Sequence, residues 1–373
     1  TGGQLMPPVM GAGAFIMAEW LGISYLTVIK AALIPGLMYF ISVAFFVHLR
    51  AVKTGIKGAS REDLPSFKDT LIEGLHFLIP IGVLIFLLLK NFSPTYCAGI
   101  ALVVLLIVSW LRPRTRIGLI DILKALRNAA ITALPISAAC AVAGIIVGVV
   151  GLTGIGLKFS AMVISVTGGN LLLALFLICL ASLVLGMGLP VTASYITLAV
   201  LAGPALKELG LPLLVGHLII FWFSQDSSVT PPVALVAYAA SGIAKSNPLE
   251  TAFNSWKLAK GLYIIPLLMA YTDLASGDYL AASRIAIPAT LGMFCITCFL
   301  ESYFLKPIRS WERPLLLLAG VGLLLPKLTW DLIGVASFCV VVLSQKFIRN
   351  DGRNKRALLS LSNKIKKSQG GAE

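Results

Sequence analysis

The chain has 373 residues, of which 58% are hydrophobic and only 12% are charged. A soluble globular domain carries about 25% charged residues, so this composition excludes an ordinary soluble protein and indicates a helical integral membrane protein. The net charge of +14 could suit nucleic acid, but the basic residues gather in loops and in the C-terminal tail without interleaved aromatic residues, which argues against that partner.

The apolar segments predict an all-α polytopic membrane protein. In chain order we expect a broken segment at 4–20, spans at 29–49, 75–89, 96–111 and 128–150, and a basic interfacial helix at 112–127. Arms at 171–185 and 192–206 predict a re-entrant hairpin, because each has about 15 residues and a full crossing needs about 20. A second broken segment at 213–240 is followed by expected spans at 257–274 and 285–305, then by a short apolar segment at 314–325 and another apolar segment at 328–344.

The distribution of Lys and Arg predicts the topology. Most of the 30 basic residues fall in loops 50–74, 112–127, 245–260 and 306–313 and in the tail from 346. If 171–206 is re-entrant, all of these segments lie on one side of the membrane, which the positive-inside rule identifies as the cytoplasm. The two broken segments then run in opposite directions, as in an inverted repeat whose binding site lies at mid-membrane.

This reading divides the chain into five regions. They are the end of a first inverted repeat (1–49), linking scaffold spans (50–169), a second inverted repeat (170–275), additional C-terminal spans (276–345) and a basic cytoplasmic tail (346–373).

Two double prolines interrupt apolar segments, at Pro7-Pro8 and at Pro231-Pro232. Proline lacks an amide N–H and its ring clashes with the carbonyl four residues earlier, so each pair is expected to break a helix and to free nearby carbonyls. New helices are expected to begin near Pro8 and Pro232. The carbonyls concerned are those of Gly3, Gln4, Ser227 and Ser228.

These breaks predict a binding site. Carbonyl oxygens beside hydroxyl groups suit a hard cation such as sodium, and the positive N-terminus of a helix suits a carboxylate. The hairpin tip at 186–190, followed by the hydroxyls of Thr192 and Ser194, is expected to contribute in the same way.

Asp226 is the only carboxylate deep within an apolar run. It could bind the coupling cation, carry a proton or make a structural hydrogen bond across the break. By contrast, His217 is expected to be a hydrogen-bonded core histidine, and Glu301 is expected to pair with Lys306 near the inner end of its span.

The sequence carries no motif for enzyme chemistry. It has no H-E-x-x-H, no paired intramembrane aspartates and no P-loop, so no catalytic residue is predicted. The six cysteines show no zinc-ligand grouping with histidine and are interpreted as small buried hydrophobic residues.

Three longer stretches carry a family resemblance, namely Thr1–Glu19 (TGGQLMPPVMGAGAFIMAE), Leu185–Tyr195 (LGMGLPVTASY) and Val229–Ala244 (VTPPVALVAYAASGIA). They resemble the large permease of TRAP transporters (tripartite ATP-independent periplasmic transporters), most closely the fused permeases of the TAXI type. The similarity extends through the spans to Glu301-Ser-Tyr and Trp311-Glu-Arg-Pro.

The resemblance implies an elevator-type secondary transporter in the bacterial inner membrane. Its substrates would be small organic acids such as dicarboxylates, keto acids or acidic amino acids. Sodium would be the coupling ion, with no other cofactor. The implied partners are a periplasmic TAXI-type solute-binding protein and small-subunit helices, fused or separate.

The motif also implies the site residues. The cation ligands would come from Gly2, Gly3, Gln4, Met6, Gly186, Met187, Asp226, Ser227, Ser228 and Thr230. The substrate would contact Pro8, Gly188, Pro190, Thr192, Ser194 and Pro232.

The family pattern also contains a Gly- and Ser-rich hairpin upstream of the first break, which this sequence does not show. We therefore expect the chain to be the C-terminal part of a longer permease and to need that remainder for activity. Two alternatives stay open: a carboxylate carrier that works without a binding protein, and a non-transporting scaffold subunit of a membrane complex.

Overall fold

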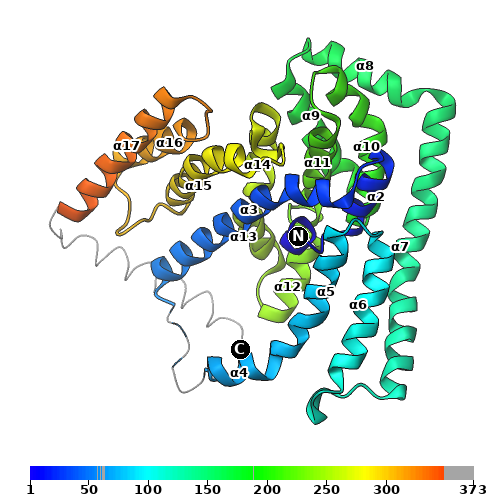
Figure 1. Cartoon of the computed structure of the whole chain (residues 1–373). Helices are drawn as coiled ribbons and strands as arrows, with labels where there is room; N and C mark the ends of the chain where they lie inside the picture. The colour runs from blue at the N-terminus through cyan, green and yellow to red at the C-terminus, as the bar shows by residue number, and fades with distance from the viewer. Residues whose placement is uncertain (57, 59, 61–63, 188, 348–373) are drawn as a thin grey trace. The chain divides into compact units, whose positions relative to one another are not determined.

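The computed structural model describes residues 1–56, 58, 60, 64–187 and 189–347, and these residues form helices joined by turns with no named strand (Figure 1). The expected all-α membrane fold is therefore confirmed at this level. The predicted basic tail at 346–373 lies almost wholly outside the described residues.

The helices follow the predicted apolar segments closely in most places. Their bounds are α1 (Gly2–Leu5), α2 (Ala12–Leu21), α3 (Tyr25–Thr54), α4 (Phe67–Gly74), α5 (Leu78–Leu89), α6 (Pro94–Ser109), α7 (Leu119–Thr153), α8 (Ile155–Thr167), α9 (Leu171–Leu185), α10 (Val191–Glu208), α11 (Leu213–Phe223), α12 (Leu235–Ala244), α13 (Pro248–Leu258), α14 (Gly261–Tyr271), α15 (Tyr279–Glu301), α16 (Glu312–Gly322) and α17 (Leu328–Phe347).

Four of these described segments are long and apolar enough to cross a membrane, namely Tyr25–Thr54, Phe67–Leu89, Tyr279–Glu301 and Leu328–Phe347. The helices on either side of Gly154 would make a fifth if counted as one span, although they are bent by 74°. Shorter apolar helices include α2, α6, α9 and α12. The mixture of long and short apolar helices is what a membrane protein with broken or re-entrant segments requires.

Two predicted boundaries are wrong. The basic stretch 112–127 is not a separate interfacial helix, because α7 runs without interruption from Leu119 to Thr153. Conversely, the expected span 257–274 is divided at Ala259 and Lys260 between α13 and α14. No proline or glycine separates Arg127 from Asn128 at the first boundary, whereas Gly261 directly follows the second and is compatible with an interruption there.

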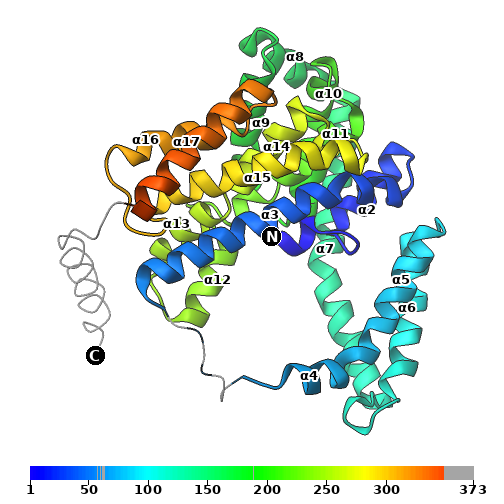
Figure 2. The same ribbon diagram turned by 60° about the vertical axis from the view of Figure 1, so that its left-hand side comes forward.

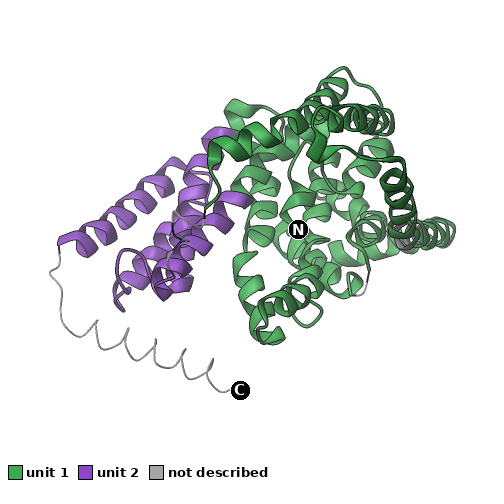
Figure 3. Ribbon diagram, turned by 90° about the horizontal axis from the view of Figure 1, so that it is seen from below, with its two compact units in different colours: residues 1–39, 59–282 green, residues 40–58, 283–373 purple. Residues whose placement is uncertain are grey.

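The helices form two compact units, coloured separately in Figure 3. The first comprises Thr1–Tyr39 and Ala59–Ala282. In it the hairpin helix α10 packs against α7, α8, α9, α11 and α2, and α11 also packs against α14 (Figures 1 and 2). The hairpin therefore lies at the centre of this unit's packing.

Local sequence explains how the hairpin forms. The side chain of Asn170 caps α9 by accepting hydrogen bonds from the amides of Leu172 and Leu173, at 2.9 and 3.2 Å. Pro190 precedes the first residue of α10, where its missing N–H costs no helical hydrogen bond. The two helices agree with the predicted arms to within two residues.

The second unit comprises Phe40–Gly58 and Ser283–Glu373, so α3 contributes its C-terminal half to this unit. Its apolar core joins Leu49 of α3 to Cys295 and Cys298 of α15, Leu316 of α16 and Val341 of α17. All of these side chains are at most 3% exposed.

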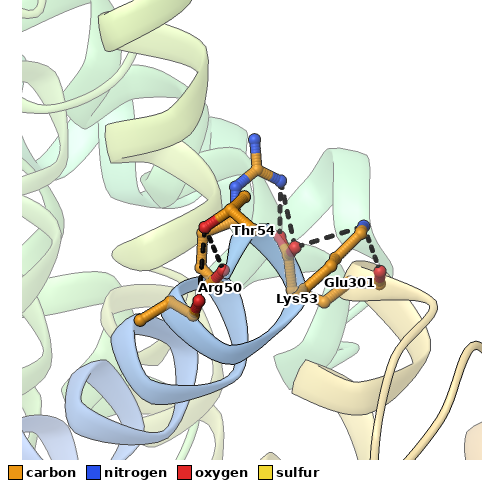
Figure 4. Close-up of polar contacts among 5 residues, drawn as sticks. Arg50, Lys53, Thr54 and Glu301 are labelled. Carbon is orange, nitrogen blue, oxygen red and sulfur yellow. Dashed lines mark hydrogen bonds and ion pairs between the residues drawn. The ribbon is translucent and has the colours of Figure 1, made fainter. Parts of the chain in front are cut away.

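A charged contact ties α3 to α15 within the second unit. Glu301, only 2% exposed, accepts from Arg50 at 3.0 Å and lies 3.5 Å from the Nζ of Lys53 (Figure 4). Glu301 thus forms ion pairs with α3, and the expected pairing with Lys306 stays a prediction.

Candidate functional site

The second double proline separates α11 from α12 within the first unit. The chain leaves α11 at Phe223, makes a short 3₁₀ turn over Asp226–Ser228, and re-enters a helix only at Leu235. Backbone bonds from the amides of Val229 and Thr230 to the carbonyl of Asp226, at 3.1 and 2.9 Å, hold this turn. The peptide bond between Pro231 and Pro232 is cis.

Asp226 is fully buried in this turn and faces the first hairpin arm. The hydroxyl of Ser182 lies 3.2 and 3.1 Å from its two carboxylate oxygens and 3.2 Å from the carbonyl of Phe223. The thiol of Cys179, one turn earlier on α9, donates to Oδ2 of Asp226 at 3.5 Å. The hairpin and the second break therefore share one buried cluster of oxygen atoms.

The hairpin tip also lies directly against this break. A β-carbon at Gly186 would stand 2.4 Å from the hydroxyl oxygen of Ser227 and 2.7 Å from the carbonyl of Ser182. Only glycine allows so close an approach at this position.

Two tyrosine hydroxyls fix the rest of the second break. The hydroxyl of Thr230 lies 2.6 Å from that of Tyr263 on α14. The hydroxyl of Tyr238 on α12 donates to the carbonyl of Pro232, also at 2.6 Å.

The first break is held in a similar manner. The hydroxyl of Thr1 lies 3.0 Å from that of Tyr39, and the hydroxyl of Tyr25 donates to the carbonyl of Pro8 at 2.9 Å. Gly36 of α3 approaches this segment closely, since a β-carbon there would lie 3.3 Å from the carbonyl of Leu5. The Pro7–Pro8 peptide bond is cis as well.

The two breaks are connected by direct packing. A β-carbon on Gly13 of α2 would lie 2.8 Å from the ring of Phe221, and 3.2 Å from that of Tyr195. The ring of Tyr39 meets that of Trp222 edge-on, with centroids 5.8 Å apart. The first break, the hairpin and the second break thus meet in one buried region.

The structure places the predicted site residues unequally. Asp226, Ser227, Thr230, Gly186 and Ser194 are buried, and the first four lie where the hairpin meets the second break. Gly2, Met6, Pro8, Thr192 and Ser228 are partly exposed. Gly3, Gln4, Met187, Pro190 and Pro232 are exposed, and Gly188 lies outside the described residues.

Two details of the predicted breaks are corrected. New helices begin at Ala12 and Leu235 rather than near Pro8 and Pro232. The carbonyl of Gln4 is not free, because it accepts from the amide of Gly11 at 2.9 Å. The prediction for His217 is confirmed, since its Nδ1 lies 2.9 Å from the hydroxyl of Tyr195.

Sequence reasoning missed several contributors, among them Ser182, Cys179, Tyr39 and Tyr263. One signal was available for the tyrosines, because Tyr39 follows Pro7 at the same interval at which Tyr263 follows Pro231. The polar residues of α9 gave no such signal, since one serine or cysteine in an apolar helix is common.

Comparison with protein families matches residues 1–274 to the family described as "Tripartite ATP-independent periplasmic transporter, DctM component". No curated protein and no solved structure matches the chain. Members of this family are permeases rather than enzymes, and they generally work with a periplasmic solute-binding protein and a small subunit. Since the match covers well over half of the sequence, the chain belongs to the DctM family, the membrane permeases of TRAP-type secondary transporters.

Proposed function

We propose that this permease couples the uptake of small organic acids to the entry of sodium ions. Its substrate would be delivered by a TAXI-type solute-binding protein at the periplasmic side of the bacterial inner membrane. The small-subunit helices would be fused to the permease, and the hairpins and broken helices would move as an elevator. The observation that carries the coupling proposal is the buried oxygen cluster around Asp226.

The cluster contains more acceptors than one proton can serve. The oxygen of Ser182 lies within 3.2 Å of the Asp226 carboxylate, the Phe223 carbonyl and the Cys179 carbonyl, yet a hydroxyl has a single proton to donate. A cation could bind among these oxygens, because oxygen ligands suit a hard cation.

The substrate site is proposed at the same junction. Thr192 stands in the first turn of α10, an 18-residue helix whose N-terminus suits a carboxylate. Ser194 follows it on the same helix, and α10 packs against α2 and α11, the helices that flank the two breaks. Tyr39 and Tyr263 follow Pro7 and Pro231 at the same interval and each lies beside a threonine hydroxyl of its break, which supports a repeat of the two segments.

Uptake by the complete transporter in proteoliposomes tests this proposal. Labelled dicarboxylates, keto acids and acidic amino acids would be offered with and without the binding protein, and with an inward gradient of either sodium or protons. Accumulation that requires both sodium and the binding protein is expected.

Each other result identifies a competing function. Uptake without the binding protein would identify a stand-alone carrier, and uptake driven only by a proton gradient would reassign Asp226 as a proton carrier. The absence of uptake for every acid under all gradients would favour a scaffold subunit.

A further inference from the structure

We propose that Gln225 recognises the substrate, and that it selects organic acids carrying a hydrogen-bond donor next to a carboxylate. This inference rests on the proposed function and narrows its substrate class. Such acids include 2-amino and 2-hydroxy acids, whereas keto acids and unsubstituted dicarboxylates lack the donor.

The evidence is a buried amide with unmet hydrogen bonds. Gln225 has no exposed surface, and neither its Nε2 nor its Oε1 has a hydrogen-bond partner among the described residues. The indole nitrogen of the fully buried Trp222 likewise lacks such a partner in the described part of the chain. Buried polar groups are normally hydrogen-bonded, so unpartnered ones call for a ligand or a functional reason.

These two side chains lie where the two breaks meet. The backbone amide of Gln225 donates to the carbonyl of Trp222 at 3.1 Å, so the residues are one turn apart on the same side of the chain. Trp222 packs edge-on against Tyr39, whose hydroxyl lies 3.0 Å from that of Thr1 in the first break. Gln225 also directly precedes Asp226, so a ligand on its amide would adjoin the proposed cation site.

The chemistry of the amide defines the ligand. Nε2 of Gln225 and Nε1 of Trp222 can only donate, which suits two carboxylate oxygens. Oε1 of Gln225 can only accept, and a carboxylate offers it nothing. A ligand that satisfies all three atoms must present a donor, such as a hydroxyl or an ammonium group, beside its carboxylate.

Binding to the purified complete transporter in detergent tests this inference without a transport step. Dissociation constants would be obtained in sodium buffer from ligand-induced shifts in thermal unfolding. Two matched pairs are compared: glutamate with 2-oxoglutarate, and malate with succinate. A site built to hydrogen-bond a substrate donor rejects the analogue that lacks it, so the donor-bearing member of a pair should bind at least about tenfold more tightly.

The variant Gln225→Leu should remove this preference and weaken binding of glutamate or malate about tenfold. Gln225→Met, with a more similar shape, serves if the leucine variant does not fold. Ser224→Ala is the matched control, because this neighbouring buried hydroxyl donates only locally, to the carbonyl of Ile220 at 2.8 Å. The control should keep the preference.

The inference would be overturned if the unaltered protein bound the two members of each pair with equal affinity. It would also be overturned if both Gln225 variants kept the preference for the donor-bearing acid. Either result leaves carboxylate transport intact. If none of the four acids binds, the proposed function itself is contradicted, and the selectivity of Gln225 with it.

Discussion

At the scale of single residues, the chemistry concentrates on one carboxylate and the groups around it. Asp226 is fully buried in the second break and accepts hydrogen bonds from the thiol of Cys179 and the hydroxyl of Ser182, both on the first hairpin arm, α9. Burying a charge is costly unless it is paired or hydrogen-bonded. Under the proposed function, the cost of burying this charge is recovered when the coupling ion binds.

Replacement of Ser182 by alanine should weaken the apparent affinity for sodium about tenfold, because a hydrogen bond to a charged group contributes about 1.5–3 kcal/mol. The sodium dependence of uptake measures the effect. Ser160→Ala is a suitable control, since that equally buried hydroxyl donates at 3.1 Å to a backbone carbonyl of α10. Equal sodium dependence in the two variants would contradict a role for Ser182 at the cation site.

Gly186 is the second residue for which the structure gives a sharp expectation. A methyl group there would lie 2.4 Å from the hydroxyl of Ser227, so Gly186→Ala must push the hairpin tip away from the second break. We expect a loss of about 1–3 kcal/mol in stability together with a loss of uptake.

Gly82→Ala provides the comparison for this variant, because no atom lies within 4 Å of a β-carbon at that helical position. It should be neutral or slightly stabilising, since alanine favours a helix over glycine. Both purified variants are compared by thermal unfolding and by uptake. If Gly186→Ala unfolds at the same temperature as Gly82→Ala and transports equally well, the close approach is contradicted.

At the scale of the helices, the sequence anticipated most elements but not their junctions. Hydrophobic length and the Gly/Pro tip were enough to place α9 and α10. They could not show that α7 continues through its basic stretch, nor that the chain needs several residues after each double proline before a helix resumes.

The contacts that complete the site come from distant parts of the chain, and this explains why they were missed. Tyr263 reaches Thr230 from α14, and Ser182 reaches Asp226 from α9. Hydrophobic periodicity reports which face of one helix is buried, but it contains nothing about which helix lies opposite. Asp226 could be predicted as a site candidate because its isolation in an apolar run is visible in the local sequence.

The contact between α3 and α15 yields a prediction at the same scale. Removing both Arg50 and Lys53 would take from the buried carboxylate of Glu301 the two cations that pair with it from α3. A fully buried pair broken in this way costs about 3–5 kcal/mol, but Arg50 is 44% exposed, so we expect about 2 kcal/mol for the double alanine variant.

The exposed pair of Arg114 and Glu73, with side chains 88% and 64% exposed, is the control for this measurement. Arg114→Ala should change the free energy of unfolding by less than about 1 kcal/mol. The free energy of unfolding of the double alanine variant and of Arg114→Ala is measured by denaturation in detergent. Equal losses of stability in the two would contradict the role given to the Glu301 ion pairs.

At the scale of the whole molecule, the boundary of the family match does not coincide with the boundary between the two structural units. The match ends at residue 274, within the first unit, which contains both breaks and the hairpin. Helices α16 and α17 belong to the second unit and lie beyond the match. The chemistry proposed for transport is therefore contained in the part that defines the family.

The central claim is that sodium drives acid uptake through Asp226, and paired measurement of labelled sodium and labelled acid fluxes tests it most directly. The complete transporter would be compared with its Asp226→Asn variant, and with Asp121→Asn, in which the altered carboxylate only caps the start of α7. We predict coupled fluxes in the unaltered protein and in Asp121→Asn, and loss of both fluxes in Asp226→Asn. Sodium-coupled uptake that persists in Asp226→Asn would contradict the account.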